Sequence, residues 1–203
     1  MSMLSNYTPQ CLVECTVSCE VSHLSQPQSA MTGAEFARRF ETAVLMARYD
    51  VNRAVTHNKG IYNGVDAVLI ATGNDFRAAE AAGHAWAARD GVYRGLTEVE
   101  VKNGIFSYSM VIPLSVGVVG GLTGIHPMAK ASLLLLGKGD AGSLMSVAAA
   151  AGLANNFSAV RSLITTGIQR GHMKLHLMNM LNRLGASPNE KKQTLPVMEF
   201  AYF

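Results

Sequence analysis

The chain has 203 residues, of which 49% are hydrophobic and 15% are charged, and its formal net charge is +3. This length and composition exclude a disordered chain and predict one good-sized core, or one domain with a piece of another. The positive charges are few and scattered, without a basic run or a basic-aromatic alternation, so we expect no nucleic-acid partner.

The first predicted element is a strand over residues 11–22, where apolar and polar residues alternate. It contains Cys11, Cys15 and Cys19. Residues four apart on a strand lie roughly 13 Å apart, which is too far for one zinc ion, so we expect buried reduced thiols. The first ten residues lack the basic and apolar regions of a secretory signal, and we expect a cytoplasmic protein.

Helices are predicted to follow this strand. Thr32 and Glu35 have the spacing of a capping box, which predicts a helix that runs to about Arg48. A short helical turn from Asp50 is expected to lead into a polar loop around His57. The apolar run 61–72 fits either a strand or a buried helix, and the small residues that continue after it favour a helix. The positions expected on the buried side of the first helix are Phe36, Phe40, Val44 and Met46.

The second half of the chain predicts a hairpin and further helices. Asn103-Gly104 separates two alternating runs, 94–101 and 105–112, and this is a strong hairpin signal. Residues 116–121 are typical of a glycine-rich loop. The fold class we expect is α+β, a hairpin or small sheet packed on apolar helices. The helices are expected over residues 127–136, 141–155 and, with breaks, 157–184.

Two charge-free stretches, 103–129 and 141–160, could be mistaken for membrane spans. The first contains prolines and several glycines, and the second contains serine and asparagine residues among small apolar ones. These compositions are typical of loops and of helices packed inside protein, so we expect no membrane span.

Three residues could form a site for carbonyl chemistry. Lys59 could stabilise an oxyanion, Asp75 could hold the lysine charged, and His172 could protonate a leaving group. The alternatives are an ordinary exposed lysine and a helix-capping aspartate. His172 and His176 stand four residues apart, which leaves a metal site open, although no acidic or cysteine ligand lies near them. The sequence has neither a P-loop nor a Gly-x-Gly-x-x-Gly motif.

Three blocks of sequence resemble 3-hydroxy-3-methylglutaryl-coenzyme A (HMG-CoA) reductase, especially its bacterial, soluble class. They are THNKGIYNGVDAVLIATGND (56–75), VGVVGGLTGIHP (116–127) and GIQRGHMKLH (167–176). The resemblance covers residues 11–184, and the blocks follow the order of the family. Two positions depart from the family's usual pattern: Leu122 replaces Ala or Gly and could crowd the active-site loop, and Ser162 replaces Ala.

The resemblance implies a role for each matched residue. Lys59 would stabilise the thioester oxygen, Asp75 would tune that lysine, and His172 would protonate the departing coenzyme A thiolate. Arg53 and Asn63 would bind the hydroxymethylglutaryl group. The implied reaction is the reduction of HMG-CoA to mevalonate and CoA, or its reverse, with NADH or NADPH, without a metal, in a homodimer whose active sites form at the subunit interface.

The resemblance also implies a domain organisation. Residues 1–167 would be part of the large, substrate-binding domain, and residues 168–203 a truncated C-terminal flap. The family's catalytic glutamate and the Asp-x-Met-Gly-x-Asn motif of its cofactor-binding small domain are not in the sequence, so we expect that domain to be absent and the isolated chain to be inactive. Two other functions stay open: a non-catalytic remnant that keeps the fold and a dimer or CoA-binding surface, and a metal hydrolase based on His172 and His176.

Overall fold

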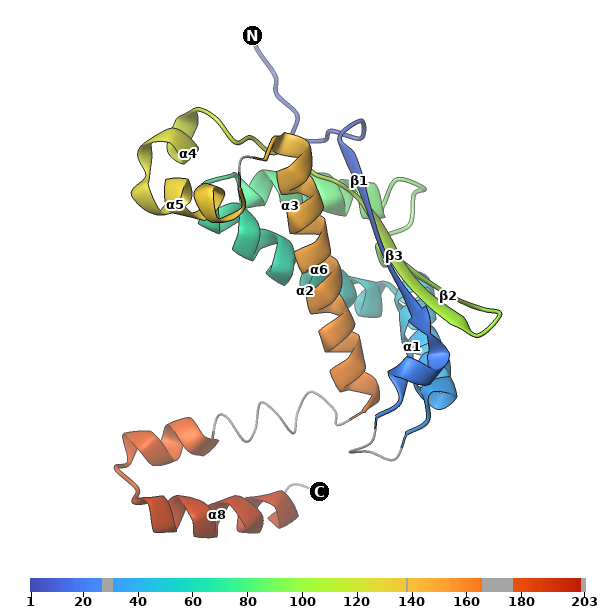
Figure 1. Ribbon diagram of the computed structural model, residues 1–203, viewed down its shortest axis with the longest axis vertical. Helices are drawn as coiled ribbons and strands as arrows, with labels where there is room; N and C mark the ends of the chain where they lie inside the picture. Colours follow the sequence, from blue (N-terminus) through green and yellow to red (C-terminus); the bar gives the residue numbers. More distant parts are fainter. Residues whose placement is uncertain (27–30, 138, 166–176, 202–203) are drawn as a thin grey trace. The chain divides into compact units, whose positions relative to one another are not determined.

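The computed structural model describes residues 1–26, 31–137, 139–165 and 177–201, and it divides into two compact units, Met1–Arg161 and Ser162–Phe203 (Figure 1). The predicted domain boundary after residue 167 stays a prediction. The second unit contains α8 (Pro188–Ala201). The first unit contains β1 (Leu12–Glu20), η1 (Val21–Leu24), α1 (Gly33–Tyr49), α2 (Val51–Ala71), α3 (Phe76–Ala87), β2 (Thr97–Lys102), β3 (Ile105–Pro113), α4 (Gly121–Ile125), α5 (Pro127–Leu135) and most of α6 (Ala141–Ile164).

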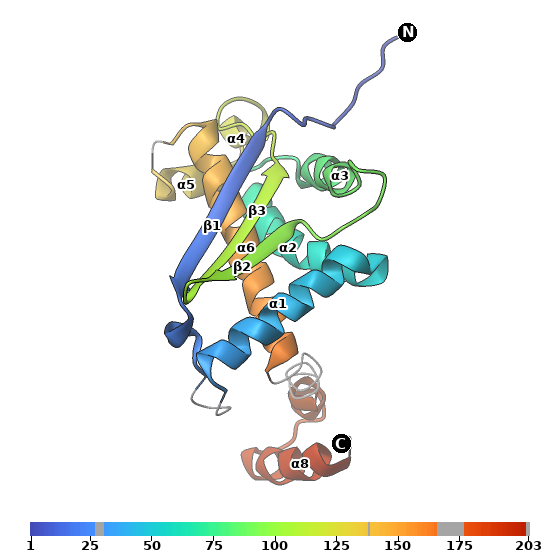
Figure 2. The same ribbon diagram turned by 90° about the vertical axis from the view of Figure 1, so that its right-hand side faces the viewer.

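The sheet of the first unit is antiparallel, with the strand order β1-β3-β2. The predicted hairpin between β2 and β3 is confirmed, because Asn103 and Gly104 adopt φ angles of 52° and 77°, which a tight turn of this type requires. Helices α1, α2 and α6 lie behind the sheet in Figure 2. The expected α+β fold class is therefore confirmed.

An aromatic cluster fills the space between the sheet and these helices. Phe40 of α1 lies 5.3 Å from Phe106 and 5.0 Å from both Tyr108 and Phe157, measured between ring centroids. Phe40, Phe106 and Tyr108 are all fully buried. The core thus joins α1, β3 and α6, and the site described below rests on it.

The predicted start of α1 is confirmed, because the Thr32 hydroxyl accepts a hydrogen bond from the backbone N–H of Glu35 at 3.2 Å. Phe36, Phe40 and Val44 are buried as expected, but Met46 is 56% exposed. The three buried positions are spaced by four residues and share one helix face, whereas Met46 is rotated about 200° from Val44. The prediction was wrong for Met46.

The predicted loop around His57 is also wrong, since α2 is one continuous helix. Asp50 caps it by accepting a hydrogen bond from the N–H of Asn52 at 3.0 Å. The glycines that suggested a loop bring helices together: a Cβ on Gly64 would collide with the backbone of Ala151 and Gly152 in α6. Gly60 and Gly64 are a close-packing surface of a helix and do not mark a turn.

Helix α6 continues through Asn156, where a break was expected. Its Gly152 lies against α2, because a Cβ at that position would lie 3.2 Å from Ile61. By length and composition alone, α6 is apolar enough to cross a membrane, and 39% of its most apolar window is buried within the protein.

The three cysteines of the N-terminal segment are free and only partly buried, so the expectation of fully buried thiols was wrong. The reason is that β1 is an edge strand and presents one face and one edge away from the core. Burial still raises the pKa of the Cys15 thiol.

Candidate functional site

Helix α2 carries three of the five predicted site residues. Lys59 and Asn63 lie four residues apart, on one exposed face of the helix. Arg53 is rotated about 120° from Lys59 around the helix axis and is half-buried. The structure therefore brings Lys59 and Asn63 together and points Arg53 elsewhere.

Asn63 lines a hollow of about 670 Å³ between α2, α5 and α6. Its lining includes small residues such as Ala67, Ala71 and Ala151, and none of the described residues that line it is charged. Lys59 lies one helical turn before Asn63 on the same face. A carboxylate or an oxyanion near Asn63 would thus find its nearest cation on α2 at Lys59.

Two asparagines of α6 form hydrogen bonds to the turn of α2 that carries Lys59. Asn155 donates a hydrogen bond to the carbonyl of Gly60 at 2.6 Å, and Asn156 donates one to the carbonyl of His57 at 2.7 Å. These two carbonyls flank Lys59. We call Asn155 and Asn156 the amide clamp.

The amide clamp continues into a buried polar network. The Tyr108 hydroxyl donates to the Oδ1 atom of Asn156 at 2.5 Å, and its oxygen is hydrogen-bonded to the Thr97 hydroxyl at 3.1 Å. His57 Nε2 is hydrogen-bonded to the same Thr97 hydroxyl at 2.7 Å. All of these side chains are buried. Because Thr97 and Tyr108 belong to the sheet, the network fixes the rotation of the α2 turn that carries Lys59 about the helix axis.

The imidazole of His57 is kept neutral by its surroundings. Burial first, and then the charge of the neighbouring Arg53 guanidinium, lowers its pKa to about 4. Arg53 Nε is itself buried without a hydrogen-bond partner in the part of the chain that the structure describes. A buried arginine N–H without a partner is suited to donate a hydrogen bond to an anionic group.

Asp75 begins α3, and its carboxylate accepts a hydrogen bond from the N–H of Ala78 at 3.1 Å. The alternative considered for this aspartate, a helix cap, is therefore what the structure shows. The preceding residue, Asn74, holds the glycine-rich segment, since its amide donates to the carbonyl of Gly117 at 3.1 Å and accepts from the N–H of Gly117 at 2.8 Å. Two of the three sequence blocks therefore meet beside Asp75.

Lys59 and Asp75 do not meet within one chain. Lys59 and Ala71 are twelve positions apart in α2, about 18 Å along the helix axis, and Asp75 lies beyond that end. No ion pair or hydrogen bond joins the two side chains among the described residues, and both are exposed. His172 and His176 lie outside the described residues.

The side chain of Leu122 is 57% exposed, and the crowding expected at the active-site loop stays a prediction. Gly73, on the neighbouring turn, has a φ of 72° and lies against the backbone of α4. The departure from the family pattern at Leu122 thus adds exposed apolar surface to α4.

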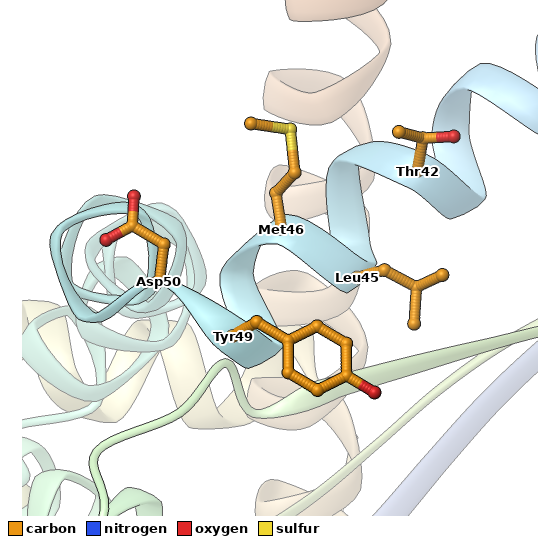
Figure 3. Close-up of a pocket in the computed structure, with 5 residues that line it drawn as sticks. All are labelled: Thr42, Leu45, Met46, Tyr49 and Asp50. Atoms are coloured by element: carbon orange, nitrogen blue, oxygen red, sulfur yellow. The ribbon is translucent and has the colours of Figure 1, made fainter.

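A second hollow, of about 360 Å³, lies at the junction of α1 and α2 and contains none of the predicted site residues (Figure 3). Its walls include Leu45, Met46 and Tyr49, and Asp50 supplies its carboxylate. This carboxylate would repel a phosphate group.

Neither hollow fits a nicotinamide dinucleotide. A pyrophosphate needs cationic side chains or a glycine-rich turn at a helix N-terminus. The larger hollow is lined without a charge and the smaller one has only a carboxylate. Over the ranges that the structure describes, no cluster of three or more His, Cys, Asp or Glu side chains could hold a metal ion.

Sequence reasoning missed the amide clamp. The signal was present, because Asn155 and Asn156 interrupt a long run of small apolar residues. Two adjacent amides in such a run indicate buried hydrogen bonds to a neighbouring backbone.

Comparison with known proteins agrees with this picture. Residues 1–177 match the family described as hydroxymethylglutaryl-coenzyme A reductase. The chain is 48% identical over 167 residues to the 3-hydroxy-3-methylglutaryl-coenzyme A reductase of Archaeoglobus fulgidus, which covers 82% of this chain and 38% of the relative. It is 35% identical to the probable reductase of Borreliella burgdorferi, over 80% of this chain and 39% of that protein. The chain thus spans about two fifths of the length of these curated relatives.

Solved structures show the same likeness. The class II HMG-CoA reductase of Streptococcus pneumoniae, bound to NADPH in open conformations, superposes with a TM-score of 0.76 at 41% identity, over 93% of this chain and 46% of that chain. A second structure of the pneumococcal enzyme gives a TM-score of 0.77 at 40% identity, over 97% and 46%. The family match, the sequence identity and the fold lead to one conclusion: this chain belongs to the hydroxymethylglutaryl-coenzyme A reductase family.

Proposed function

We propose that the chain supplies the substrate side of an HMG-CoA reductase site, for the reduction of HMG-CoA to mevalonate and CoA or for the reverse reaction. The observation that carries the proposal is the placement of Lys59 and Asn63 on one exposed face of α2, beside an uncharged hollow of about 670 Å³. Family membership supplies the substrate class.

In this proposal the Lys59 ammonium stabilises the negative charge that develops on the thioester oxygen. A positive charge placed where an oxyanion forms is worth more in a site that excludes water. Asn63 donates its amide to the hydroxymethylglutaryl group. Arg53, whose Nε has no hydrogen-bond partner among the described residues, is proposed as a further residue for that group, from another side of α2. His172 returns a proton to the coenzyme A thiolate.

The hydride would come from NADH or NADPH bound outside the residues of this chain. Because the isolated chain contributes only part of the catalytic group, we expect it to have no reductase turnover of its own.

Asp75 is proposed to act on the Lys59 of a second copy. Lys59 lies near the middle of α2 and Asp75 lies beyond its C-terminal end, so the proposed pair would join two copies of the chain. The exposed apolar surface over α4 and α5 supports a homodimer, since six large side chains there are between 57% and 89% exposed. They are Val119, Leu122, Ile125, Met128, Leu134 and Leu135.

Substrate binding can be measured on the chain by calorimetric titration with HMG-CoA, mevalonate and CoA. We expect Lys59→Met to weaken HMG-CoA binding at least about tenfold, the effect of losing one charge-assisted contact. Lys102→Met, at the exposed hairpin turn, is the matched control and should bind as the wild type does. Equal binding by Lys59→Met and wild type would refute the assignment. If Lys59→Met and the wild type bind CoA with equal affinity, the result would support the alternative that the chain is a non-catalytic remnant.

Assembly can be tested with a zero-length carbodiimide, which joins an amine to a carboxylate in direct contact. We expect a covalent dimer that disappears in both Lys59→Ala and Asp75→Ala and persists in Lys102→Ala. A cross-link that survives both substitutions would exclude the intermolecular pair. Zinc found by elemental analysis would instead favour the metal-hydrolase alternative at His172 and His176.

We also propose a cytoplasmic location, on the family's soluble bacterial class. A reporter fused to the chain and followed through cell fractionation tests it.

A further inference from the structure

Four buried polar residues next to the α2 turn that carries Lys59 form a closed ring of hydrogen bonds, which we call the polar circuit. His57 Nε2 is hydrogen-bonded to the Thr97 hydroxyl at 2.7 Å, and that hydroxyl is hydrogen-bonded to the Tyr108 oxygen at 3.1 Å. Tyr108 bonds to Asn156, whose Nδ2 donates to the His57 carbonyl at 2.7 Å. No member is more than 6% exposed. The polar circuit therefore begins at the ring of His57 and ends at its backbone carbonyl.

The protons of the polar circuit can be arranged in only one way. A carbonyl oxygen only accepts, so Asn156 turns its amide nitrogen to His57 and its amide oxygen to Tyr108. The single hydroxyl proton of Tyr108 is then donated to Asn156, and the Tyr108 oxygen must accept the proton of Thr97. The Thr97 hydroxyl has no second proton, so its oxygen accepts from His57. All four hydrogen bonds therefore point in one direction around the ring.

This arrangement assigns the tautomer of His57. Its Nε2 carries the ring proton, because only an N–H can donate to the Thr97 oxygen. The ring is neutral because it is buried, so Nδ1 carries no proton and can only accept. Nδ1 has no hydrogen-bond partner in the part of the chain that the structure describes. Among the described residues, the hydrogen bond to Thr97 therefore orients the ring of His57.

We propose that Thr97 is a positioning residue for Lys59, because its hydroxyl is the link through which the ring of His57 is held to the sheet. Thr97 is the first residue of β2, and its hydroxyl accepts from His57 and donates to Tyr108. Without this hydroxyl, the Nε2–H of His57 and the oxygen of Tyr108 both lose a partner in a buried space. Removal of one oxygen atom thus opens the polar circuit on both sides of Thr97.

The effect on Lys59 follows from the place of His57 in α2, and it rests on the proposed role of Lys59. The polar circuit holds two groups of His57, its ring and its backbone carbonyl, two positions before Lys59. Two groups held at one turn oppose rotation of that turn about the helix axis. Side chains end about 5–6 Å from the axis of a helix, so a rotation of about 10° would move the end of Lys59 by about 1 Å. Such a displacement is large for a cation that must meet a developing charge.

The first test needs no substrate. We expect nitrogen-15 NMR of the wild-type chain at pH 7 to show His57 as the neutral Nε2–H tautomer, with its signals identified by their loss in His57→Gln. Thr97→Val has nearly the same shape without the hydroxyl, and we expect both tautomers of His57 to be populated in this variant. An Nδ1–H tautomer in the wild type would overturn the direction of the polar circuit and the proposal with it.

The second test is calorimetric titration with HMG-CoA, in which a double-mutant cycle separates positioning from general stability. We expect Thr97→Val to weaken binding about tenfold, and Thr97→Ser, which keeps the hydroxyl, to bind within about twofold of the wild type. The double variant Lys59→Met/Thr97→Val should bind within about twofold of Lys59→Met, because it has no ammonium group to displace. Val13→Ala, which removes core volume on β1, is the control and should bind as the wild type does.

Tyr108→Phe breaks the polar circuit at the next bond and takes the place of Thr97→Val if that variant does not fold. Wild-type binding by both of these variants, or a loss that adds fully to that of Lys59→Met, would overturn the positioning role. Wild-type binding by Lys59→Met would overturn the Lys59 assignment, and the positioning role with it. The tautomer of His57 is measured without substrate, so the two failures can be told apart.

Discussion

The amide clamp makes a quantitative prediction about the helix turn that carries Lys59. Asn156 is buried to 1% exposure, donates to the His57 carbonyl at 2.7 Å and accepts from the Tyr108 hydroxyl at 2.5 Å. Asn156→Ala removes both hydrogen bonds and leaves a small cavity against α2. Two net hydrogen bonds of about 1 kcal/mol each, together with lost packing, predict a destabilisation of about 2–4 kcal/mol.

Asn155 offers the matched comparison on the same helix. It is half-buried and makes one described hydrogen bond, to the Gly60 carbonyl at 2.6 Å. Asn155→Ala should therefore cost only about 1 kcal/mol. Tyr108→Phe removes one partner of Asn156, and combined with Asn156→Ala it should be less than additive, because both substitutions break the same bond.

Urea unfolding at pH 7 and 25 °C, followed by circular dichroism, measures the free energy of unfolding for the wild type and the four variants. A cost for Asn156→Ala that is no larger than that for Asn155→Ala would refute the reasoning. Strict additivity of Asn156→Ala and Tyr108→Phe would do the same for the bond between them.

Three further substitutions test other parts of the site region. Gly83→Ala should destabilise the chain by about 1–3 kcal/mol in urea unfolding, because its methyl group would collide with the Tyr62 hydroxyl, whose ring is 1% exposed; an unchanged midpoint would contradict the packing. Asp75→Ala should cost about 1 kcal/mol of unfolding free energy through the lost cap, whereas Asp75→Asn should be near neutral, and equal losses in the two variants would argue against capping. His57 has a folded pKa of about 4 against 6.5 unfolded, so wild-type stability should fall by about 3 kcal/mol as the pH drops from 6.5 to 4, and His57→Gln should flatten that decline; the same slope in both chains would exclude His57 as its source.

The sequence predicted the elements whose signals are local. The hairpin at Asn103-Gly104 and the cap at Thr32 need only a few neighbouring residues, and both are confirmed. The capping role of Asp75 is local in the same sense. Such features depend on backbone geometry that one short stretch of chain decides.

The errors occurred where distant residues decide the structure. Gly60 and Gly64 indicate a loop when they are considered alone, but they allow α6 to approach α2 closely. Asn156 could mark a helix end, but it is satisfied by His57 and Tyr108, far from it in the sequence. Tertiary partners overrode local propensity at these positions.

The candidate site was predicted in part. Lys59 and Asn63 lie on one face of α2. Their spacing of four residues predicts this once the segment is known to be helical. The direct contact expected between Lys59 and Asp75 is not formed within one chain. A spacing of sixteen residues does not show that a helix separates the two positions. It also cannot show whether the two residues pair between two copies of the chain.

The edge strand β1 has a practical consequence for anyone who prepares this protein. Among the described strands, β3 pairs with one side of β1 only, so nine residues keep a row of backbone donors and acceptors on the other side. Another extended chain can pair with this row of backbone groups. The partly accessible thiols of the two chains could then be oxidised by air to intermolecular disulfides. A reducing buffer and low protein concentration during refolding should keep the preparation from forming oxidised, sheet-rich aggregates.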